Sequence, residues 1–143
     1  MTPTDASDSP LVALVTALGR RDVDAAVALC SPDCRLATAD GRRAEGRAGV
    51  RDLLAGFLSD LRSATYELTA QWHQDEVWFA EVLASYELRD WLRLEQLPRA
   101  FVVRTDDAGI CDVRVYGAHE RPLTDRRSGD ETYRVGGHTL LPL

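Results

Sequence analysis

The chain has 143 residues, of which 45% are hydrophobic and 28% charged, and its formal net charge is -6. This length suits one domain with its own core, and the acidic balance argues against nucleic acid or an anionic membrane as a partner. No apolar run approaches the roughly 20 residues that cross a bilayer. Residues 1–9 lack the basic and apolar parts of a signal peptide, so we expect a cytoplasmic protein.

All 17 basic residues are arginine, and the chain contains neither lysine nor asparagine. Without lysine it can form no Schiff base and no phosphate-binding loop of the Walker type. Cys30, Cys34 and Cys111 are an odd number of cysteines in a chain without a signal peptide, which favours reduced structural thiols. The histidines show no metal-ligand spacing, and the sequence contains neither a Rossmann nor a phosphate-binding loop, so we expect neither a metal nor an organic cofactor.

The chain begins with two helices. Ser9 is a good N-cap and Pro10 suits the first helical position, so a helix is predicted from there to Gly19. Asp22 caps a second, shorter helix, which Pro32 ends.

A small hairpin and a third helix follow. A short strand over 34–38 reaches a turn at Asp40-Gly41, which is a typical hairpin signal, and the chain returns over 42–45. The third helix is entered through Gly46 and has the clearest apolar face of the chain, made of Val50, Leu53, Leu54, Phe57 and Leu61.

The second half of the chain predicts four antiparallel strands, over 65–73, 76–88, 91–104 and 110–116. Polar and apolar residues alternate in the first of them, which predicts one face made of Tyr66, Leu68, Ala70 and Trp72. Pro98 interrupts the third strand, so we expect a bulge or a bend there.

The strand over 76–88 is apolar on both faces. One face carries Val77, Phe79 and Leu83, and the other carries Trp78, Ala80, Val82, Ala84 and Tyr86. A strand of this kind is covered on both faces. We expect the helices on one face and a second copy of the chain, in a homodimer, on the other.

Helices followed by strands predict an α+β fold, with the helices gathered on one face of a strongly bent, mostly antiparallel sheet. Such a cone has an open end, which is the expected pocket for a small apolar organic ligand. Residues 121–131 predict a loop, and 133–143 are apolar enough to pack back on the body. We therefore interpret the chain as a single domain with a core over 11–117 and a C-terminal extension over 118–143.

Three stretches resemble a known family. They are GRAGVR at 46–51, which leads into the third helix; RDVDAAVAL at 21–29, which ends in Ser-Pro-Asp; and the closing hairpin over 107–117. Together they are similar to the nuclear transport factor 2-like superfamily, nearest its SnoaL-like branch, over residues 11–117. The resemblance implies the cone-shaped fold and says little about the reaction.

The resemblance also implies where catalytic residues of this fold would lie. The tyrosine, the base aspartate and the protonated aspartate of ketosteroid isomerases fall at Leu14, at Thr38, and at Ala100 or Phe101. Asp40 takes the base position only if the loop is shifted. SnoaL-like cyclases carry an aspartate where this chain has Val115 and Ala118, with His119 next to them. Scytalone dehydratases and limonene-epoxide hydrolases usually include an asparagine, which is absent here, so no familiar catalytic set is intact.

Glu81, Asp40 and His119 are the candidate catalytic residues for proton transfer. Glu81 lies in the most apolar strand, where a buried carboxyl group would act as an acid or a base; the alternative is an ion pair with Arg104 or Arg114 across the sheet.

The other two candidates also have simpler interpretations. The resemblance places Asp40 near the mouth of the cone, but Asp-Gly is also what a tight turn demands. His119 follows the last strand, and with Asp112 or Glu120 it would form a tuned base, or else it is solvated.

Aromatic residues are the candidate ligand-binding residues, namely Tyr116, Trp72, Tyr86, Trp91 and Phe57. They either line a pocket for a flat apolar ligand or fill the core and a dimer face. Tyr116 is favoured, because the resemblance puts a ring at that point of the cavity wall.

The sequence thus predicts a small-molecule-binding protein with an apolar pocket. One alternative is a cofactor-independent cyclase, isomerase or hydrolase that moves a proton on a polyketide- or terpenoid-like substrate. Another is a non-catalytic dimerisation module whose own side chains fill the cavity. These alternatives differ in whether a carboxylate or an imidazole points into an empty cavity.

Overall fold

The computed structural model describes residues 2–3, 9–117, 126–127 and 131–132. Its helices are α1 (Pro10–Gly19), α2 (Val23–Ala28) and α3 (Gly46–Ser59). Its strands are β1 (Thr2–Pro3), β2 (Cys30–Ala37), β3 (Arg43–Glu45), β4 (Leu61–Gln74), β5 (Val77–Leu88), β6 (Arg93–Asp106), β7 (Gly109–Tyr116), β8 (Arg126–Arg127) and β9 (Glu131–Thr132). Within the stretch over 121–131 that the sequence predicts as a loop, β8 instead pairs with β9 in a short antiparallel sheet. The rest of that stretch and the predicted packing of 133–143 lie outside the described residues.

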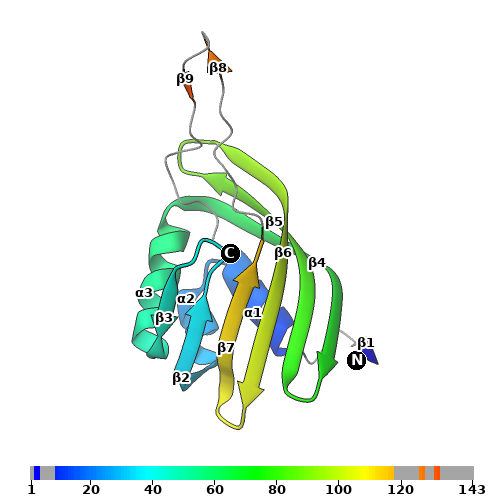
Figure 1. Ribbon diagram of the computed structural model, residues 1–143. Coiled ribbons are helices and arrows are strands. Elements are labelled where there is room, and N and C mark those ends of the chain that lie inside the picture. Colours follow the sequence, from blue (N-terminus) through cyan, green and yellow to red (C-terminus); the bar gives the residue numbers. More distant parts are fainter. Residues whose placement is uncertain (1, 4–8, 118–125, 128–130, 133–143) are drawn as a thin grey trace.

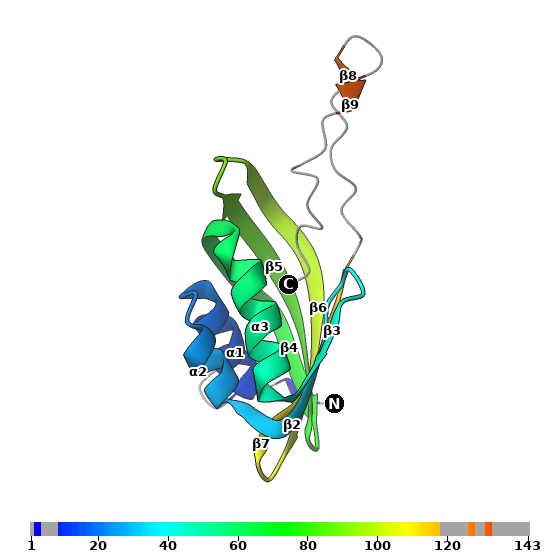
Figure 2. The same ribbon diagram turned by 90° about the vertical axis from the view of Figure 1, so that its left-hand side faces the viewer.

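One curved sheet organises this part of the chain, with the strand order β1-β4-β5-β6-β7-β2-β3. Its neighbouring strands are antiparallel except β2 and β7, which are parallel. The helices lie together on one side of the sheet (Figure 2), which we call the inner face. The opposite, outer face is turned toward the viewer in Figure 1. This α+β arrangement confirms the predicted fold class.

The predicted helix starts are confirmed by their caps. The Ser9 hydroxyl accepts hydrogen bonds from the backbone N–H groups of Leu11 and Val12, at 3.2 and 3.3 Å. The Asp22 carboxylate accepts one from the N–H of Ala25 at 3.0 Å. These contacts satisfy N–H groups that a helix start leaves without partners.

α3 buries Val50, Leu54, Phe57 and Leu58 on the inner face. Leu61, which the sequence assigns to this helix, instead begins β4 and is fully buried there. No helix among the described residues is long and apolar enough to cross a membrane.

β5 shows how the two faces of the sheet differ. Ala80, Val82 and Ala84 are buried on the inner face, while Phe79 and Leu83 on the outer face are half-buried. The described helices therefore cover one face only. The apolar outer face, which the sequence predicts to be covered as well, is partly exposed within the described part of the chain.

A bulge in β4 changes the predicted face of Trp72. Leu68 pairs with Val82 but Ala70 pairs with Glu81, so Thr69 is an extra residue that shifts the register. Because side chains alternate along a strand, one extra residue moves those that follow to the opposite face. Trp72 therefore shares the outer face with its partner Phe79, and the expected single face with Tyr66 is wrong.

The irregularity expected near Pro98 lies slightly earlier in β6. The register shifts between the pairs Ala84–Leu97 and Tyr86–Leu94. Gln96 has a left-handed backbone with φ of 55°, and its N–H donates to the Ser85 hydroxyl at 3.0 Å. The bulge thus precedes the proline, which itself pairs with the outer-face residue Leu83.

The parallel contact between β2 and β7 was not predicted from the sequence. β2 is longer than the expected 34–38 strand and begins at Cys30, which pairs with Ile110. The N–H of Ile110 donates to the carbonyl of Leu29 at 2.9 Å. This contact joins the end of the second helix to the last hairpin, and so fixes the helical layer to the sheet.

Candidate functional site

Three polar side chains from adjacent strands meet on the inner face of the sheet. Tyr66 of β4 pairs with Ala84, and Arg99 of β6 pairs with Val82, so both lie on the same face as Tyr86 of β5. Tyr86 is 2% exposed and Arg99 is 4% exposed. We call Tyr66, Tyr86 and Arg99 the inner polar cluster.

Aromatic rings surround this cluster. The Tyr86 ring meets those of Phe57 and Tyr66 edge to face, with ring centroids 5.5 and 5.9 Å apart. Tyr66 meets Phe101 in the same way at 6.4 Å. Edge-to-face pairs of this kind hold rings in defined positions. Two predicted pocket residues are therefore in contact, because the ring of Tyr86 in β5 packs against the ring of Phe57 in α3.

Burial sets the protonation state of the two tyrosines. It raises the pKa of Tyr66 well above its ordinary value, and the neighbouring Tyr86 raises it further. Burial likewise raises the pKa of Tyr86, while the charge of Arg99 lowers the pKa of both. Both phenols remain protonated near neutral pH and act as hydrogen-bond donors.

Neither phenol has a well-aligned hydrogen-bond partner among the described residues, although both oxygens are buried. Each affects the pKa of the other as a close neighbour would. A side-chain hydrogen bond between the two phenols also contributes to both pKa shifts. Such a bond uses one hydroxyl proton and leaves the other hydroxyl without an acceptor among the described residues. A buried hydroxyl without a hydrogen-bond partner lowers the stability of the folded protein by roughly 1–3 kcal/mol. Native structures contain few such groups.

Arg99 is held against the backbone at the end of β7. Its Nη1 donates to the carbonyl of Pro98 at 2.8 Å. A side chain at Gly117 would place its Cβ 2.7 Å from both Cδ and Nη1 of Arg99. Glycine at position 117 therefore leaves the room that this buried arginine occupies.

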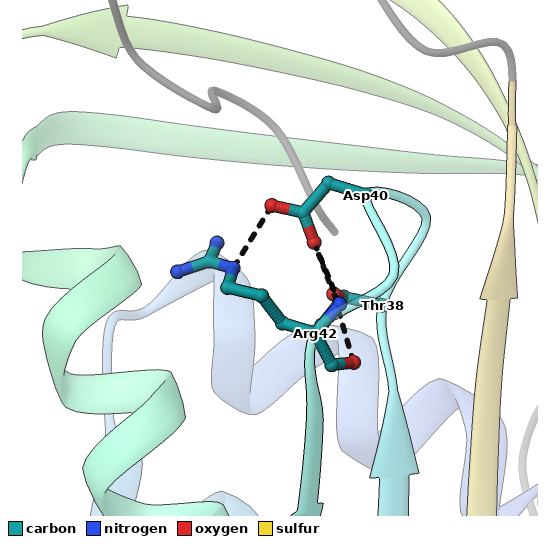
Figure 3. A network of polar contacts seen from close by, with 3 residues as sticks. All are labelled: Thr38, Asp40 and Arg42. Atoms are coloured by element: carbon teal, nitrogen blue, oxygen red, sulfur yellow. Dashed lines mark hydrogen bonds and ion pairs between the residues drawn. The ribbon is translucent and has the colours of Figure 1, made fainter.

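Asp40 is held in the turn between β2 and β3. Its Oδ1 accepts from the Thr38 hydroxyl at 2.5 Å, and its Oδ2 forms an ion pair with Nε of Arg42 at 2.9 Å (Figure 3). The N–H of Arg42 donates to the same Oδ1 at 3.2 Å. The Asp40 side chain is only 3% exposed. These contacts are those of a tight Asx turn, so the carboxylate has a structural use whatever else it does.

Glu81 lies on the outer face and is exposed, which contradicts the expected burial. None of the ion pairs between described residues includes it, so the expected pair with Arg104 or Arg114 is absent from this part of the chain. Its carboxylate faces the hydroxyl of Thr69 at 3.5 Å. In register, Glu81 pairs with Ala100, and Ala100 pairs with Tyr116 on the other side.

The remaining predicted residues are not part of the inner polar cluster. Tyr116 is 52% exposed on the outer face, between two clefts of about 400 Å³ each. Trp91 is 64% exposed in the turn between β5 and β6, with the guanidinium carbon of Arg62 3.4 Å from its ring centroid. His119 lies outside the described residues.

The thiols do not form a second site. Cys30 and Cys34 are buried beside an apolar void of about 20 Å³. Burial, and after it the neighbouring Cys34, raises the pKa of Cys30 to about 12, which makes it a poor nucleophile. Within the described residues, no group of three His, Cys, Asp or Glu side chains is placed to hold a metal ion.

Sequence reasoning missed Tyr66 and Arg99 as site residues. Tyr66 was assigned to the correct strand face but not to a site. Arg99 had a signal that could have been used, because it alternates with the buried residues Leu97, Phe101 and Val103. An arginine at a core position of a strand is rare enough to mark a site.

The model of the SnoaL-like domain family matches residues 11–113. No curated protein sequence matches the chain. A protein with a ketosteroid isomerase-like fold from Catenulispora acidiphila DSM 44928, solved in complex with trimethylamine, has a TM-score of 0.70 and 16% identity, covering 76% of this chain and 85% of that one.

Two further solved structures are similar. A protein from Shewanella putrefaciens CN-32 assigned as a SnoaL-like polyketide cyclase has a TM-score of 0.68 and 10% identity, over 80% of each chain. An LEH-like epoxide hydrolase from M. tuberculosis has a TM-score of 0.66 and 19% identity, over 76% of this chain and 79% of that one. At these identities the similarity establishes the fold alone.

The match to the SnoaL-like domain model places the chain in the nuclear transport factor 2-like superfamily, and the curved sheet with helices on its inner face agrees with this. Within it, the chain belongs to the SnoaL-like domain family, whose model covers most of its length. The resemblance inferred from the sequence is confirmed.

Proposed function

We propose that this protein binds a small, mainly apolar organic molecule inside the cone, with an acceptor oxygen of the molecule at the inner polar cluster. The observation that carries the proposal is the pair of buried phenol hydroxyls without aligned partners among the described residues. A ligand oxygen placed between Tyr66 and Tyr86 would accept both hydrogen bonds. These hydrogen bonds would favour binding, because they remove the free-energy penalty of burying hydroxyl donors that have no acceptor.

The chemistry of the cluster defines the ligand class. Both phenols are protonated donors, and a guanidinium has donors only. A carbonyl or carboxylate oxygen suits this cluster, whereas an amine or an ammonium group does not. The rings of Phe57 and Phe101 favour an aromatic or otherwise flat apolar body next to that oxygen.

Two ligands of nearly equal shape test this proposal. Acetophenone carries a carbonyl oxygen, and isopropylbenzene has a methyl group in its place. Isothermal titration calorimetry should show acetophenone binding at least about tenfold more tightly, since a buried hydrogen bond contributes about 1 kcal/mol and an unsatisfied donor costs more. Equal affinities, or no binding of either ligand, would contradict the proposal.

Variants identify the residues responsible. Tyr86→Phe should remove most of the preference for acetophenone while the protein remains as stable as wild type or becomes slightly more stable, because the variant no longer buries an unpartnered hydroxyl. Tyr116→Phe is the matched control: it removes a phenol hydroxyl from the outer face and should leave the preference unchanged.

Proton transfer is the second candidate, and one observation favours it. Donors around a carbonyl oxygen also stabilise an enolate, and Asp40 is a carboxylate with little exposure at the hairpin of β2 and β3. Both of its oxygens are already bonded within the turn, and Glu81 is on the opposite face of the sheet. Binding without catalysis is therefore the better-supported function.

The same probe separates the two functions. A base next to bound acetophenone would exchange its methyl protons for deuterium in D₂O, which proton NMR measures directly. We expect no acceleration over buffer. Acceleration that is lost in Asp40→Asn but kept in Asp33→Asn, an exposed carboxylate at the start of β2, would establish the catalytic function instead.

A further inference from the structure

A cleft of about 400 Å³ lies at the side of the sheet where β7, β2 and β3 run next to each other (Figure 1). Several of the residues that line it are small, namely Ala37, Ala39, Gly41, Ala44 and Gly117. Small residues leave space on a sheet that longer side chains would fill. A cleft of this volume is large enough to hold a small organic molecule.

Two arginines flank this cleft in one row of the sheet. Ala37 of β2 pairs with Arg114 of β7 on one side and with Arg43 of β3 on the other. Neighbouring strands are about 4.8 Å apart, so the α-carbons of the two arginines are roughly 10 Å apart, on the same face. Both arginines are exposed and line the cleft. Side chains of this length, at this spacing, can both reach one anion above Ala37.

A buried carboxylate orients the arginines on one side of the cleft. Asp112 is 4% exposed. Its Oδ1 accepts a hydrogen bond from Nε of Arg114 at 3.1 Å, and its Oδ2 forms an ion pair with Nη2 of Arg35 at 3.2 Å. A guanidinium has five N–H donors, so each of these arginines keeps donors for a second carboxylate. Asp112 thus holds both guanidiniums in position before a ligand binds.

The charges that line the cleft add up to a small positive excess. Arg35, Arg43 and Arg114 face two acids, Asp112 and the exposed Glu45, which leaves a net charge of +1. None of the ion pairs between described residues includes Arg43. The whole chain, in contrast, has a net charge of -6. A monoanion therefore balances the cleft, whereas a dianion would leave excess negative charge beside the two acids.

Tyr116 adds a flat apolar surface next to these charges. It lines the cleft with 52% of its surface exposed, and it follows Arg114 by two residues in β7, so both point to the same face. A hydrogen bond with Tyr116, and after it one with Asp112, raises the pKa of Arg114. The phenol ring is therefore beside the guanidinium and can pack against a flat ligand.

We propose that this cleft binds an aromatic carboxylate, whose carboxylate group lies above Ala37 between Arg114 and Arg43 and whose ring packs against Tyr116. The charge of the cleft suits a monoanion, and the planar guanidiniums suit a planar carboxylate, to which they can donate two parallel hydrogen bonds. The sequence predicts Tyr116 as a ligand-binding residue inside the cone; here it binds a ligand on the outer face. None of the residues of the inner polar cluster lines this cleft, so the two sites are separate.

Three small probes of similar shape test the site by titration in proton–nitrogen correlation NMR. Benzoate should shift the amide signals of Ala37, Gly41 and Gly117 with a Kd of about 1 mM or lower. Benzyl alcohol, which has no charge, should leave them in place. Phenyl phosphate carries more negative charge near neutral pH and should bind no more tightly than benzoate. Absence of these shifts with benzoate, equal shifts with benzyl alcohol, or tighter binding of phenyl phosphate would overturn the proposal.

A pair of variants separates a specific site from general attraction by arginine. Arg43→Gln should weaken benzoate binding by roughly fivefold, because it removes one of the two flanking guanidiniums. It breaks no ion pair between described residues, so the fold should be kept, which the same spectra show. Arg20→Gln is the matched control, since it removes an exposed arginine at the end of α1 and should leave the affinity unchanged. Equal affinities of these two variants for benzoate would contradict the proposed site.

Discussion

Trp91 occupies a backbone conformation that disfavours its side chain. Its φ is 70°, in the left-handed region where glycine and asparagine are common and bulky residues are rare. The N–H of Trp91 donates to the carbonyl of Leu88 at 2.9 Å, and the N–H of Leu88 to the carbonyl of Leu92 at 2.8 Å, so the hairpin itself imposes this conformation. The cation–π contact between the Arg62 guanidinium and the Trp91 ring offsets part of the free-energy cost of this backbone conformation.

Substitutions at Trp91 should therefore follow an unusual order of stability. Trp91→Ala keeps the left-handed strain of about 1–2 kcal/mol and loses a cation–π contact of about 0.5–1 kcal/mol. Trp91→Gly loses the same contact but relieves the strain, so it should be about 1 kcal/mol more stable than the alanine variant in urea unfolding. The reverse order would show that the turn adopts another conformation in solution.

Among the connections between elements, the one from α2 to β7 depends on a single close approach. Gly109 has φ of 126°, and a Cβ there would lie 2.6 Å from the carbonyl oxygen of Leu29. That same oxygen accepts the hydrogen bond from Ile110. Because both groups belong to the backbone, the collision cannot be relieved by rotating a side chain.

Gly109→Ala should consequently destabilise the protein by about 2–3 kcal/mol, the cost of a strained backbone plus the displaced strand. Gly56→Ala is the matched control, since this glycine is in α3 with nothing within 4 Å of its added Cβ. In a helix interior that change should stabilise by about 0.5–1 kcal/mol. Thermal unfolding of both variants measures the contrast, and similar effects at the two positions would refute the close approach.

For the molecule as a whole, buried weak acids govern stability at alkaline pH. Burial raises the pKa of Cys30 from 9.0 to about 12 and raises the pKa values of Tyr66 and Tyr86 above 10.0. The unfolded chain loses these protons first, so stability is fully present below those ordinary values and falls as the pH rises toward the folded-state values. No lysine titrates in this range, because the chain has none.

The free energy of unfolding should thus decrease between about pH 9 and pH 11, by roughly 1.4 kcal/mol per pH unit for each group that is ionised only in the unfolded state. Urea unfolding at several pH values measures this slope. A variant with both Cys30→Ala and Tyr86→Phe should show a shallower slope than wild type. A slope that is unchanged in this variant would mean that other groups determine the alkaline limit.

The sequence by itself determined the class of fold and most of its elements. Capping by Ser9 and Asp22, the apolar face of α3 and the turn at Asp40-Gly41 are local signals, and local hydrogen bonding and periodicity are enough to read them. The resemblance to the SnoaL-like branch had the same source, since it rests on short stretches at element boundaries. Phe57 and Tyr86 were named as candidate ligand-binding residues because both belong to apolar runs, and their rings are in contact in the structure.

Only the tertiary structure decided which side chains share a face. The extra residue Thr69 moved Trp72 to the outer face, and the pairing of β5 with β6 put Glu81 outside and Arg99 inside. Such assignments depend on register, which a bulge changes by one residue without altering the apolar pattern much. The parallel contact of β2 with β7 joins residues about eighty positions apart. Local signals carry no information about such contacts, so the inner polar cluster appears only when the sheet is assembled.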